Sequence, residues 1–366
     1  MVMVNEGELS RFEVEVEGWA ARDDSGILSP INFTRRKTGS NDVTFKVAYC
    51  GICHSDLHQI RNEWKNSMYP MVPGHEIVGL VTEVGSEVKK FAVGDRVGVG
   101  CMVWSCQQCD SCSEGQEQYC DKTVLTYNAI NADGSPTFGG YSSLMVCNQR
   151  FVVKIPETLP FDAEAPLLCA GITVYSPMKY LQMTEPGKSL GVVGLGGLGH
   201  MAVKLGKAFG LRVTVISTSP KKEKEAREVL GADHFIISKD QKQMQDAAKS
   251  LDYIIDTVSA DHPIQPLISL LKVQGKLVLV GLPENPIYFH PAAVISGRRF
   301  VGGSSIGGVK ETQEMLDFCA EHNISCMIEN IPIDYVNTAM ERLGKGDVKY
   351  RFVINVAESY SSPTAN

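Results

Sequence analysis

The stretch that decides the fold is Ser189-Leu190-Gly191-Val192-Val193-Gly194-Leu195-Gly196-Gly197-Leu198-Gly199. A buried apolar strand ends at this glycine run, and a helical pattern from about Leu198 to Phe209 follows it. In such a unit the first glycine permits the tight turn, the second lets the backbone approach a pyrophosphate, and the last allows close packing of helix on strand. The free N–H groups of the helix N-terminus supply the anion site. A dinucleotide site is therefore predicted at Gly194, Leu195, Gly196, Gly197, Leu198 and Gly199, with a plain strand-to-helix turn as the alternative.

The regions around this stretch differ in pattern. After Cys169, strands at 212–216, 234–237, 253–256 and 276–280 alternate with helical segments, which predicts a parallel doubly wound sheet. Residues 12–160 show short strands, at 43–49, 77–84, 96–99 and 151–155, between Gly-rich turns, which favours an irregular β domain. An amphipathic helix at 310–322 and a strand at 349–356 close the chain, and this last strand is expected to return to the first domain. The predicted domains are 1–169 with 308–366, and 170–307.

The end of the second strand of the doubly wound part bears on the choice of dinucleotide. NAD(H) calls for an acidic residue there, but the chain reads Ile216-Ser217-Thr218-Ser219-Pro220-Lys221-Lys222. Hydroxyl and ammonium groups can bind a 2′-phosphate by charge-assisted hydrogen bonds. Ser217, Thr218, Ser219 and Lys222 therefore predict NADP(H). A helix N-cap with a solvated basic first turn is a second interpretation, compatible with the first.

Four cysteines, Cys106, Cys109, Cys112 and Cys120, form a C-x2-C-x2-C-x7-C run. Four thiolates on one short loop can surround a tetrahedral Zn²⁺, which predicts a closed structural site. An iron–sulfur cluster, reduced surface thiols, or a disulfide pair in a secreted chain are the alternatives.

A second set of metal-binding residue types is dispersed along the chain, at Cys53, His75-Glu76 and Cys169. Taken alone, a cysteine in an apolar setting is usually a small core residue, and a histidine after a glycine is usually a turn residue. Only the fold can bring these residues together. If it does, they predict a zinc site with a coordination position free for chemistry.

Composition restricts the class of protein. The chain has 366 residues, of which 43% are hydrophobic and 21% charged, as expected for two globular domains. Its net charge of −7 argues against a nucleic-acid partner. Eleven cysteines, an odd number, favour a reducing compartment, and the acidic N-terminus lacks signal or transit features. No apolar stretch is long enough for a membrane span, so a cytoplasmic location is expected.

Several motifs occur together: Gly74-His75-Glu76, the four-cysteine run, the glycine run, and Cys53-His54-Ser55-Asp56-Leu57-His58. With them the chain resembles the zinc-dependent medium-chain alcohol dehydrogenases, and within these the plant cinnamyl alcohol dehydrogenase group. The likeness extends from about residue 18 to residue 352. It implies a GroES-like irregular β-barrel catalytic domain and a Rossmann domain that binds NADP(H).

The resemblance implies roles for individual residues. Cys53, His75 and Cys169 hold the catalytic zinc, and Glu76 is the neighbouring carboxylate that can replace the water at the open position. Ser55 hydrogen-bonds the substrate oxygen, and His58 is the far end of a proton relay. Other implications are that Cys50 is not a ligand, that His54 and Asp56 are supports, and that a homodimer forms through the cofactor domains at residues 299–301.

The chain departs from the cinnamyl alcohol dehydrogenase pattern in the substrate pocket. Leu125 stands where that group has a tryptophan, and Ser305 stands where it has a phenylalanine before an Ile-Gly pair. Trp104 is a large residue that could border the pocket or simply pack. The expected function is reversible oxidation of a primary allylic alcohol, of phenylpropanoid or terpenoid type, by NADP(H). The alternatives are a reductase of iminium or conjugated enal groups, and a protein that binds NADP(H) and zinc without turnover.

Overall fold

The computed structural model describes residues 13–131 and 133–361. The chain divides into two compact units by its internal contacts. Unit 1 comprises the described residues up to Cys169 together with those from Gly307 onward, and unit 2 is Ala170–Ile306. The chain therefore leaves unit 1 once, forms unit 2, and returns.

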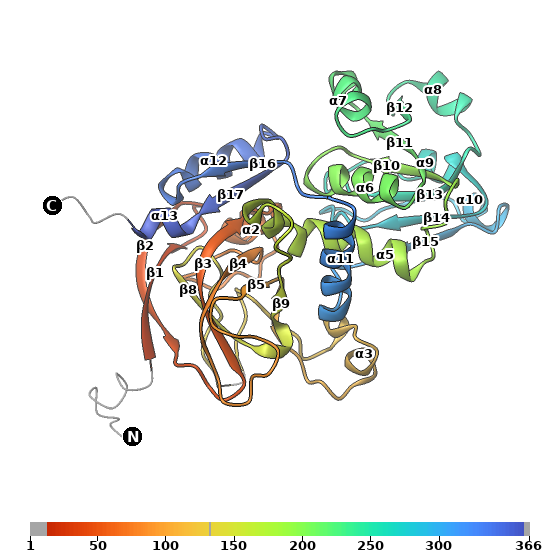
Figure 1. The fold of residues 1–366 in the computed structure, drawn as a ribbon. Helices are drawn as coiled ribbons and strands as arrows, with labels where there is room; N and C mark the ends of the chain where they lie inside the picture. The colour runs from red at the N-terminus through yellow and green to blue at the C-terminus, as the bar shows by residue number, and fades with distance from the viewer. Residues whose placement is uncertain (1–12, 132, 362–366) are drawn as a thin grey trace. The chain divides into compact units, whose positions relative to one another are not determined.

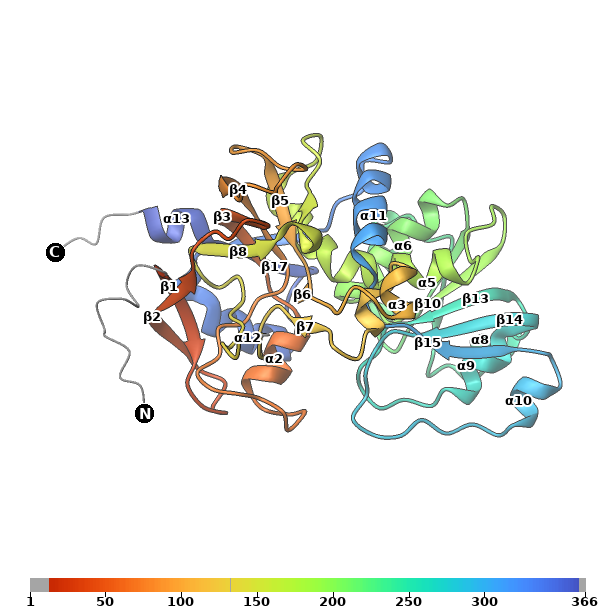
Figure 2. The ribbon, with the colours of Figure 1, turned by 90° about the horizontal axis from the view of Figure 1, so that it is seen from below.

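Unit 2 is a doubly wound α/β domain (Figure 1). Its six strands are parallel and lie in the order β12-β11-β10-β13-β14-β15. Helices α5 and α6 lie on one face of this sheet, and α9 and α10 lie on the other (Figure 2). The elements are α5 Ala170–Tyr180, β10 Ser189–Val193, α6 Gly197–Ala208, β11 Arg212–Ser217, η4 Pro220–Lys222, α7 Glu223–Glu228, β12 His234–Ile237, α8 Gln241–Asp246, β13 Leu251–Asp256, α9 Gln265–Leu270, β14 Leu271–Leu279, α10 Ala292–Ile295 and β15 Phe300–Gly303.

The strands of unit 2 are almost continuously apolar because helices cover both faces of the sheet. Ile216, Ile254 and Leu277, from three different strands, are completely buried in one core cluster. The strand order reverses between β10 and β13. In sheets of this kind ligands bind at such a switch point, at the carboxyl ends of the strands. The glycine turn after β10 lies at this place.

Unit 1 is built around a seven-stranded sheet in the order β16-β17-β3-β4-β5-β9, with β8 paired to β3. Strands β1 and β2 form an antiparallel ladder beside it, and β6 and β7 form another. The elements are β1 Glu13–Ala21, β2 Leu28–Arg36, β3 Asp42–Gly51, α2 His54–Ile60, β4 Ile77–Val84, β5 Arg96–Val99, β6 Met102–Trp104, α3 Asp110–Ser113, η1 Glu117–Tyr119, β7 Val124–Leu125, β8 Leu144–Asn148, η2 Gln149–Phe151, β9 Val153–Lys154, α4 Phe161–Glu164, η3 Ala165–Leu168, α11 Val309–Glu321, β16 Ile328–Ile331, η5 Ile333–Tyr335, α12 Val336–Gly344, β17 Arg351–Asn355 and α13 Val356–Ser361.

β17, the last strand among the described residues, lies in unit 1. β17 pairs antiparallel with β3, where Ile354 lies opposite Cys50. This pairing places β17 beside the segment that leads into Cys53. The strand predicted at 151–155 was wrong in extent, because residues 149–151 form a 3₁₀ turn in which the Asn148 side chain accepts the Arg150 N–H. Only Val153 and Lys154 remain as β9.

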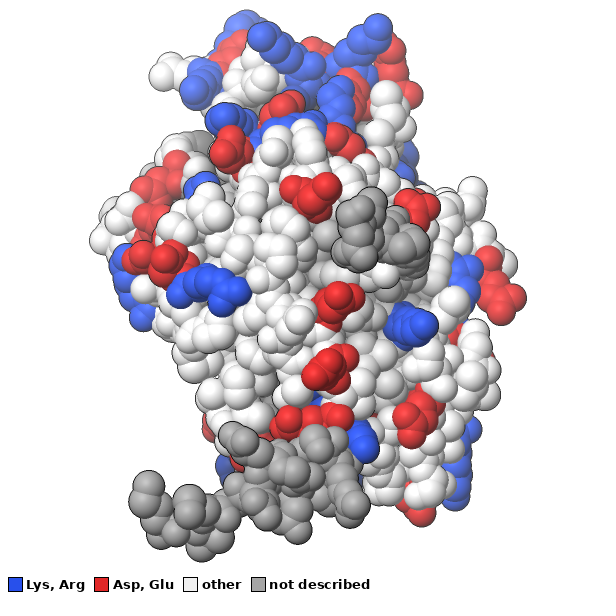
Figure 3. Space-filling model, turned by 90° about the vertical axis from the view of Figure 1, so that its left-hand side faces the viewer, with Lys and Arg blue, Asp and Glu red and all other residues white. Residues whose placement is uncertain are grey.

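Acidic and basic side chains mix on the surface. Lys and Arg gather at the upper end of the face drawn in Figure 3, among Asp and Glu. On α7 the two signs pair four residues apart, as Lys224 with Glu228 and Arg227 with Glu223. Within the described residues, the helices are all too short or too polar for a membrane span.

Candidate metal and dinucleotide sites

The dispersed residues Cys53, His75, Glu76 and Cys169 converge in unit 1. Cys53 caps α2 just after β3, His75 and Glu76 immediately precede β4, and Cys169 ends η3. All four are buried, and one potential ligand atom from each lies within 4.8 Å of the others. The Cys53 and Cys169 sulfurs are 3.9 Å apart. Zn–S bonds of about 2.3 Å in a tetrahedron place two sulfurs roughly 3.8 Å apart, so this spacing fits zinc.

The Asp56 side chain contacts two members of this cluster. Its carboxylate accepts the Cys53 N–H at 2.8 Å and lies 3.3 Å from His75 Nδ1. It also accepts hydrogen bonds from the Gly74 N–H and the Tyr141 hydroxyl. Because Nδ1 of His75 is engaged, Nε2 is the nitrogen left for a metal, and a carboxylate behind a ligating imidazole increases its basicity. Asp56 thus contacts Cys53 and His75, and its role as a support rather than a reactant stays a prediction.

Glu76 is held by a residue that the sequence reasoning did not single out. The Arg351 guanidinium donates to Glu76 Oε1, and both side chains are buried. Glu76 Oε2 has no hydrogen-bond partner among the described residues. A buried carboxylate oxygen without a partner is costly, and a cation is the natural ligand for it. A buried carboxylate needs a cation nearby, and this need of Glu76 was the signal that could have pointed to Arg351.

Gly51 shows how tightly this oxygen is enclosed. A Cβ atom at position 51 would lie 1.9 Å from Glu76 Oε2, so only glycine fits. Burial raises the pKa of Glu76 to about 7, against the effect of Arg351. The side-chain contact with Cys169 lowers the pKa of Cys53 well below its usual range. The donor set is thus two thiols, an imidazole and an unpaired carboxylate oxygen, which together suit Zn²⁺.

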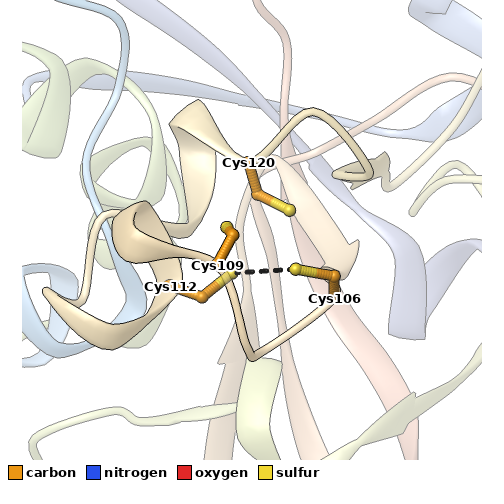
Figure 4. A group of neighbouring side chains, drawn as sticks. All are labelled: Cys106, Cys109, Cys112 and Cys120. Carbon is orange, nitrogen blue, oxygen red and sulfur yellow. Dashed lines mark hydrogen bonds between the residues drawn. The ribbon is translucent and has the colours of Figure 1, made fainter.

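The thiols of Cys106, Cys109, Cys112 and Cys120 gather around one small space beside α3 (Figure 4). Cys106 and Cys112 have sulfurs 4.0 Å apart, again near the edge of a zinc–thiolate tetrahedron. The backbone N–H of Gln108 lowers the pKa of Cys106 to about 6. The Lys122 N–H donates to Cys120 Sγ at 3.4 Å. The arrangement is a four-sulfur set, which matches the ligands of a structural zinc site.

Ser55 and His58 lie three residues apart on α2, so they share one side of that helix. Ser55 Oγ lies 3.6 Å from Cys53 Sγ, next to the candidate metal. His58 is farther along, where its Nδ1 contacts a Glu63 carboxylate oxygen and its ring stacks on Trp64 at 5.1 Å. Sequence reasoning missed Glu63 and Trp64. They lie beyond the end of α2, where helical spacing no longer relates them to His58.

The glycine motif has the geometry that its sequence predicts. Gly194 has φ of 84°, a conformation that favours glycine, and its N–H donates to the Ile216 carbonyl at 2.9 Å. A Cβ atom at Gly199 would lie 2.2 Å from the Gly194 carbonyl oxygen, so α6 packs on the turn only with glycine there. Gly196 is the N-cap of α6, and a Cβ atom there would meet nothing within 4 Å. The backbone at this turn is open to a ligand.

The hydroxyl and lysine residues after β11 lie beside this turn. Lys222 Nζ donates to the Leu195 carbonyl at 2.7 Å, and Ser217 Oγ accepts the Ser219 N–H at 3.3 Å. Thr218 is exposed. The end of β11 thus presents hydroxyl groups and one ammonium group next to the glycine run, without a carboxylate from residues 216–222.

Three residues considered for the substrate pocket lie in different settings. Trp104, in β6, lines a cavity of about 860 Å³ together with Phe33 and Phe138. No member of the Cys53 cluster lines this cavity, so packing beside a separate hollow describes Trp104 better than a place at the metal. Leu125, in β7, is 42% exposed. Ser305 is exposed, and the next residue, Ile306, has φ of 41°, an unusual value for a β-branched residue.

Two family models match the chain. The alcohol dehydrogenase GroES-like domain matches residues 39–157, and the zinc-binding dehydrogenase domain matches residues 197–321. Among curated proteins, a probable mannitol dehydrogenase of Fragaria ananassa is 63% identical over 345 residues, 94% of this chain and 96% of its own length. An 8-hydroxygeraniol dehydrogenase of Catharanthus roseus is 62% identical over 349 residues, 95% and 97% of the two chains. A vomilenine reductase of Rauvolfia serpentina is 63% identical over 345 residues, 94% of this chain and 96% of its own.

Solved structures agree with these matches. A cinnamyl alcohol dehydrogenase of Sorghum bicolor superposes with a TM-score of 0.93 at 57% identity, covering 96% of this chain and 100% of its own. A cinnamyl alcohol dehydrogenase of Helicobacter pylori, solved with NADP(H), has a TM-score of 0.89 at 41% identity, covering 95% of this chain and 100% of its own. The likeness therefore spans both units.

Proposed function

The chain belongs to the zinc-dependent medium-chain alcohol dehydrogenase family, and we propose that it interconverts a primary allylic alcohol and its aldehyde with NADP(H). The observation that carries this proposal is the convergence of Cys53, His75, Glu76 and Cys169 with one carboxylate oxygen left unpaired. A site built only for structure would use four closed ligands, as the cysteine run does. The family relationship and the donor set together support an active centre in unit 1.

Within this proposal Cys53, His75 and Cys169 hold the catalytic zinc, and Glu76 is the carboxylate that can take the open position. Cys106, Cys109, Cys112 and Cys120 hold the structural zinc. When bound, the catalytic zinc supplies a Lewis acid for the substrate oxygen, and the dinucleotide supplies or accepts the hydride. Asp56 fixes the His75 ring, and Arg351 prevents Glu76 from turning freely, so two of the four side chains are pre-positioned.

The chain's own residues also move the proton. Ser55 Oγ, beside Cys53, is placed to donate to or accept from the hydroxyl oxygen of the substrate. His58 lies one turn along α2 and passes the proton on, while the Glu63 carboxylate orients its imidazole. Trp64 covers the ring and limits its rotation. Loss of this relay affects alcohol oxidation and aldehyde reduction alike, because each transfers one proton.

NADP(H) is the proposed cofactor because of the groups around the end of β11. Ser217, Ser219 and Lys222 lie beside the glycine turn, where a 2′-phosphate needs hydroxyl and cationic partners. Gly194, Gly196 and Gly199 form the turn itself, and Leu195, Gly197 and Leu198 complete the motif. The relative from Helicobacter pylori, solved with NADP(H), supports the same choice.

The test is turnover with a panel of substrates. Purified protein with two zinc ions per chain should oxidise NADPH in the presence of cinnamyl aldehydes or monoterpenoid allylic aldehydes, and reduce NADP⁺ with the corresponding alcohols. A saturated polyol such as mannitol should be a poor substrate, although three relatives bear the name probable mannitol dehydrogenase. Absence of turnover with every aldehyde and alcohol would refute the proposal and leave a zinc and dinucleotide binding protein.

A reductase of iminium or conjugated enal groups is the second candidate, because the vomilenine reductase relative is 63% identical. Hydride transfer to an iminium carbon gives a neutral amine without a proton, and hydride transfer to a conjugated enal leaves an enolate that takes its proton on carbon, so neither reaction needs a proton at an alcohol oxygen. Ser55→Ala separates the candidates: it should lower aldehyde reduction strongly, whereas iminium reduction should be almost unchanged. The panel should therefore include an alkaloid iminium compound.

Two further features concern the setting of the protein. β15 is the edge strand of the sheet in unit 2. Phe300 on this strand and Ile295 before it are exposed, as is common at an edge strand that pairs with a second copy of the chain. A homodimer through residues 299–301 accounts for this edge, and Phe300→Lys should shift the mass in light scattering toward a monomer. None of the eleven cysteines, all of which lie among the described residues, forms a disulfide, which supports a reducing, cytoplasmic location.

A further inference from the structure

The pair His262 and Asp256 lies where the strand order of unit 2 reverses. β13 ends at Asp256, which is in register with Val193 at the end of β10. Dinucleotides bind at the carboxyl ends of strands at such a reversal. The segment that leaves β13 therefore borders the glycine turn of the proposed cofactor site.

This segment is wedged against the glycine turn. The Thr257 N–H and hydroxyl both donate to the Val193 carbonyl, at 3.1 and 2.8 Å. A Cβ atom at Gly194 would lie 2.8 Å from Val258 Cγ2, and one at Gly199 would lie 3.4 Å from Thr257 Oγ1. A shift of Thr257 or Val258 therefore disturbs the turn that receives the pyrophosphate.

The His262 side chain links two other residues of this segment, Asp256 and Ala260. Its Nε2 lies 2.7 Å from Asp256 Oδ2, and its Nδ1 lies 2.8 Å from the Ala260 carbonyl oxygen. A carbonyl oxygen and an ionised carboxylate are both acceptors, so both ring nitrogens must donate, as only the imidazolium can. Burial disfavours this charge, but the Ala260 carbonyl and Asp256 outweigh it and raise the pKa of His262.

We propose that His262 is a positioning residue for the cofactor: as an imidazolium it fixes residues 256–262 against the glycine turn, and NADP(H) binds more weakly once that proton is lost. The inference rests on the proposed dinucleotide site and adds a residue that touches neither zinc set. Neutral His262 keeps one N–H, so one of its two hydrogen bonds is lost and the segment loosens.

Two charged groups face His262. Asp256, only 1% exposed, is its direct partner, and Asp261 adds negative charge while accepting from the Asn285 amide at 2.6 Å. Both favour the imidazolium. Because the folded pKa of His262 is raised, the ordered segment persists below that pKa and is lost as pH rises through it. NADPH affinity should therefore fall on the alkaline side.

The experiment is fluorescence titration of zinc-loaded, full-length protein with NADPH from about pH 6 to about pH 9. His262→Gln can replace only the Nε2–H bond to Asp256. Asp256→Asn keeps an acceptor for the Val258 N–H and lets neutral His262 accept at Nε2, so the segment is held without a charge. His234→Gln, at an exposed histidine on β12, is the matched control. Urea unfolding of each variant checks the fold.

For wild type and His234→Gln we expect NADPH affinity to fall by about ten-fold or more across this range, the loss of one hydrogen bond to a charged group. His262→Gln should bind weakly at every pH, and Asp256→Asn should bind tightly with a flat profile. Equal profiles for all four proteins, with NADPH bound, would overturn the inference and leave the proposed function standing. Failure of wild type to bind NADPH at any pH would overturn both.

Discussion

Arg351, on the last strand of the chain, forms a buried ion pair with Glu76, the residue that directly precedes β4. The pair joins segments 275 residues apart in sequence. It lies in unit 1 beside Cys53, whose pKa Arg351 also helps to lower. β17 thus holds Glu76 of the metal-binding cluster through Arg351 and also joins β3 to β16 in the sheet.

Replacing Arg351 should therefore strongly destabilise the folded protein. Arg351→Met leaves the Glu76 carboxylate buried without its cation, and we expect a loss of roughly 3–5 kcal/mol in the free energy of unfolding. The double variant Arg351→Met/Glu76→Gln should recover a large part of this loss, because no unpaired charge remains. Urea unfolding at fixed zinc concentration measures both effects, and additive losses in the double variant would contradict the coupling.

Loss of a ligand from each of the two zinc sites should have a different effect, on activity in one case and on stability in the other. Cys169→Ser removes a catalytic ligand, so alcohol oxidation should disappear while NADPH binding and one zinc per chain remain. Cys109→Ser removes a structural ligand and should mainly lower the unfolding midpoint. Metal analysis, NADPH titration and thermal unfolding of both variants check this. Full turnover by purified Cys169→Ser protein would refute the catalytic assignment.

Cofactor choice should depend on Ser217 and Lys222. Ser217→Asp brings a carboxylate to the end of β11, which repels a 2′-phosphate and accepts hydrogen bonds from a ribose, so kcat/KM for NADPH relative to NADH should fall by about ten-fold or more. Lys222→Ala should act in the same direction. Lys224→Ala, an exposed lysine paired with Glu228, is the control. An unchanged ratio in Ser217→Asp would refute the assignment.

The proton relay should extend to Glu63. His58→Ala should lower kcat for alcohol oxidation by about 10²-fold, in the range of general acid–base catalysis, and Glu63→Gln by a smaller factor, because the amide still orients the ring. Glu83→Gln, exposed on β4, is the control. An unchanged kcat in Glu63→Gln would exclude Glu63 from the relay.

How much the sequence could predict depends on how far apart in the chain the interacting residues lie. The glycine turn and the four-cysteine loop are local, so spacing alone was sufficient to predict both. Cys53, His75 and Cys169 depend on contacts between distant segments, and only the family resemblance joined them before the structure did. Glu63 and Arg351 were missed because their partners are fixed by tertiary packing, which leaves no periodic signal.

The four-cysteine loop also contacts the N-terminus of α11, and this contact gives a final prediction. Glu117 lies between Cys112 and Cys120, and its carboxylate accepts the Val309 N–H at 3.2 Å, at the start of α11. Gly308, the N-cap, has no side chain to satisfy that N–H, and a Cβ atom there would lie 1.8 Å from the Gly115 carbonyl oxygen. Glu117 thus supplies both the missing cap and a negative charge at the helix N-terminus.

Glu117→Gln should cost about 0.5–1 kcal/mol in the free energy of unfolding, while the exposed Glu114→Gln in the same loop should cost almost nothing. In a Cys109→Ser background, where the loop is no longer held by metal, the Glu117→Gln cost should vanish, because the carboxylate is no longer presented to α11. Urea unfolding of the four proteins in this cycle measures the coupling. An undiminished cost in the Cys109→Ser background would show that Glu117 caps the helix independently of the zinc.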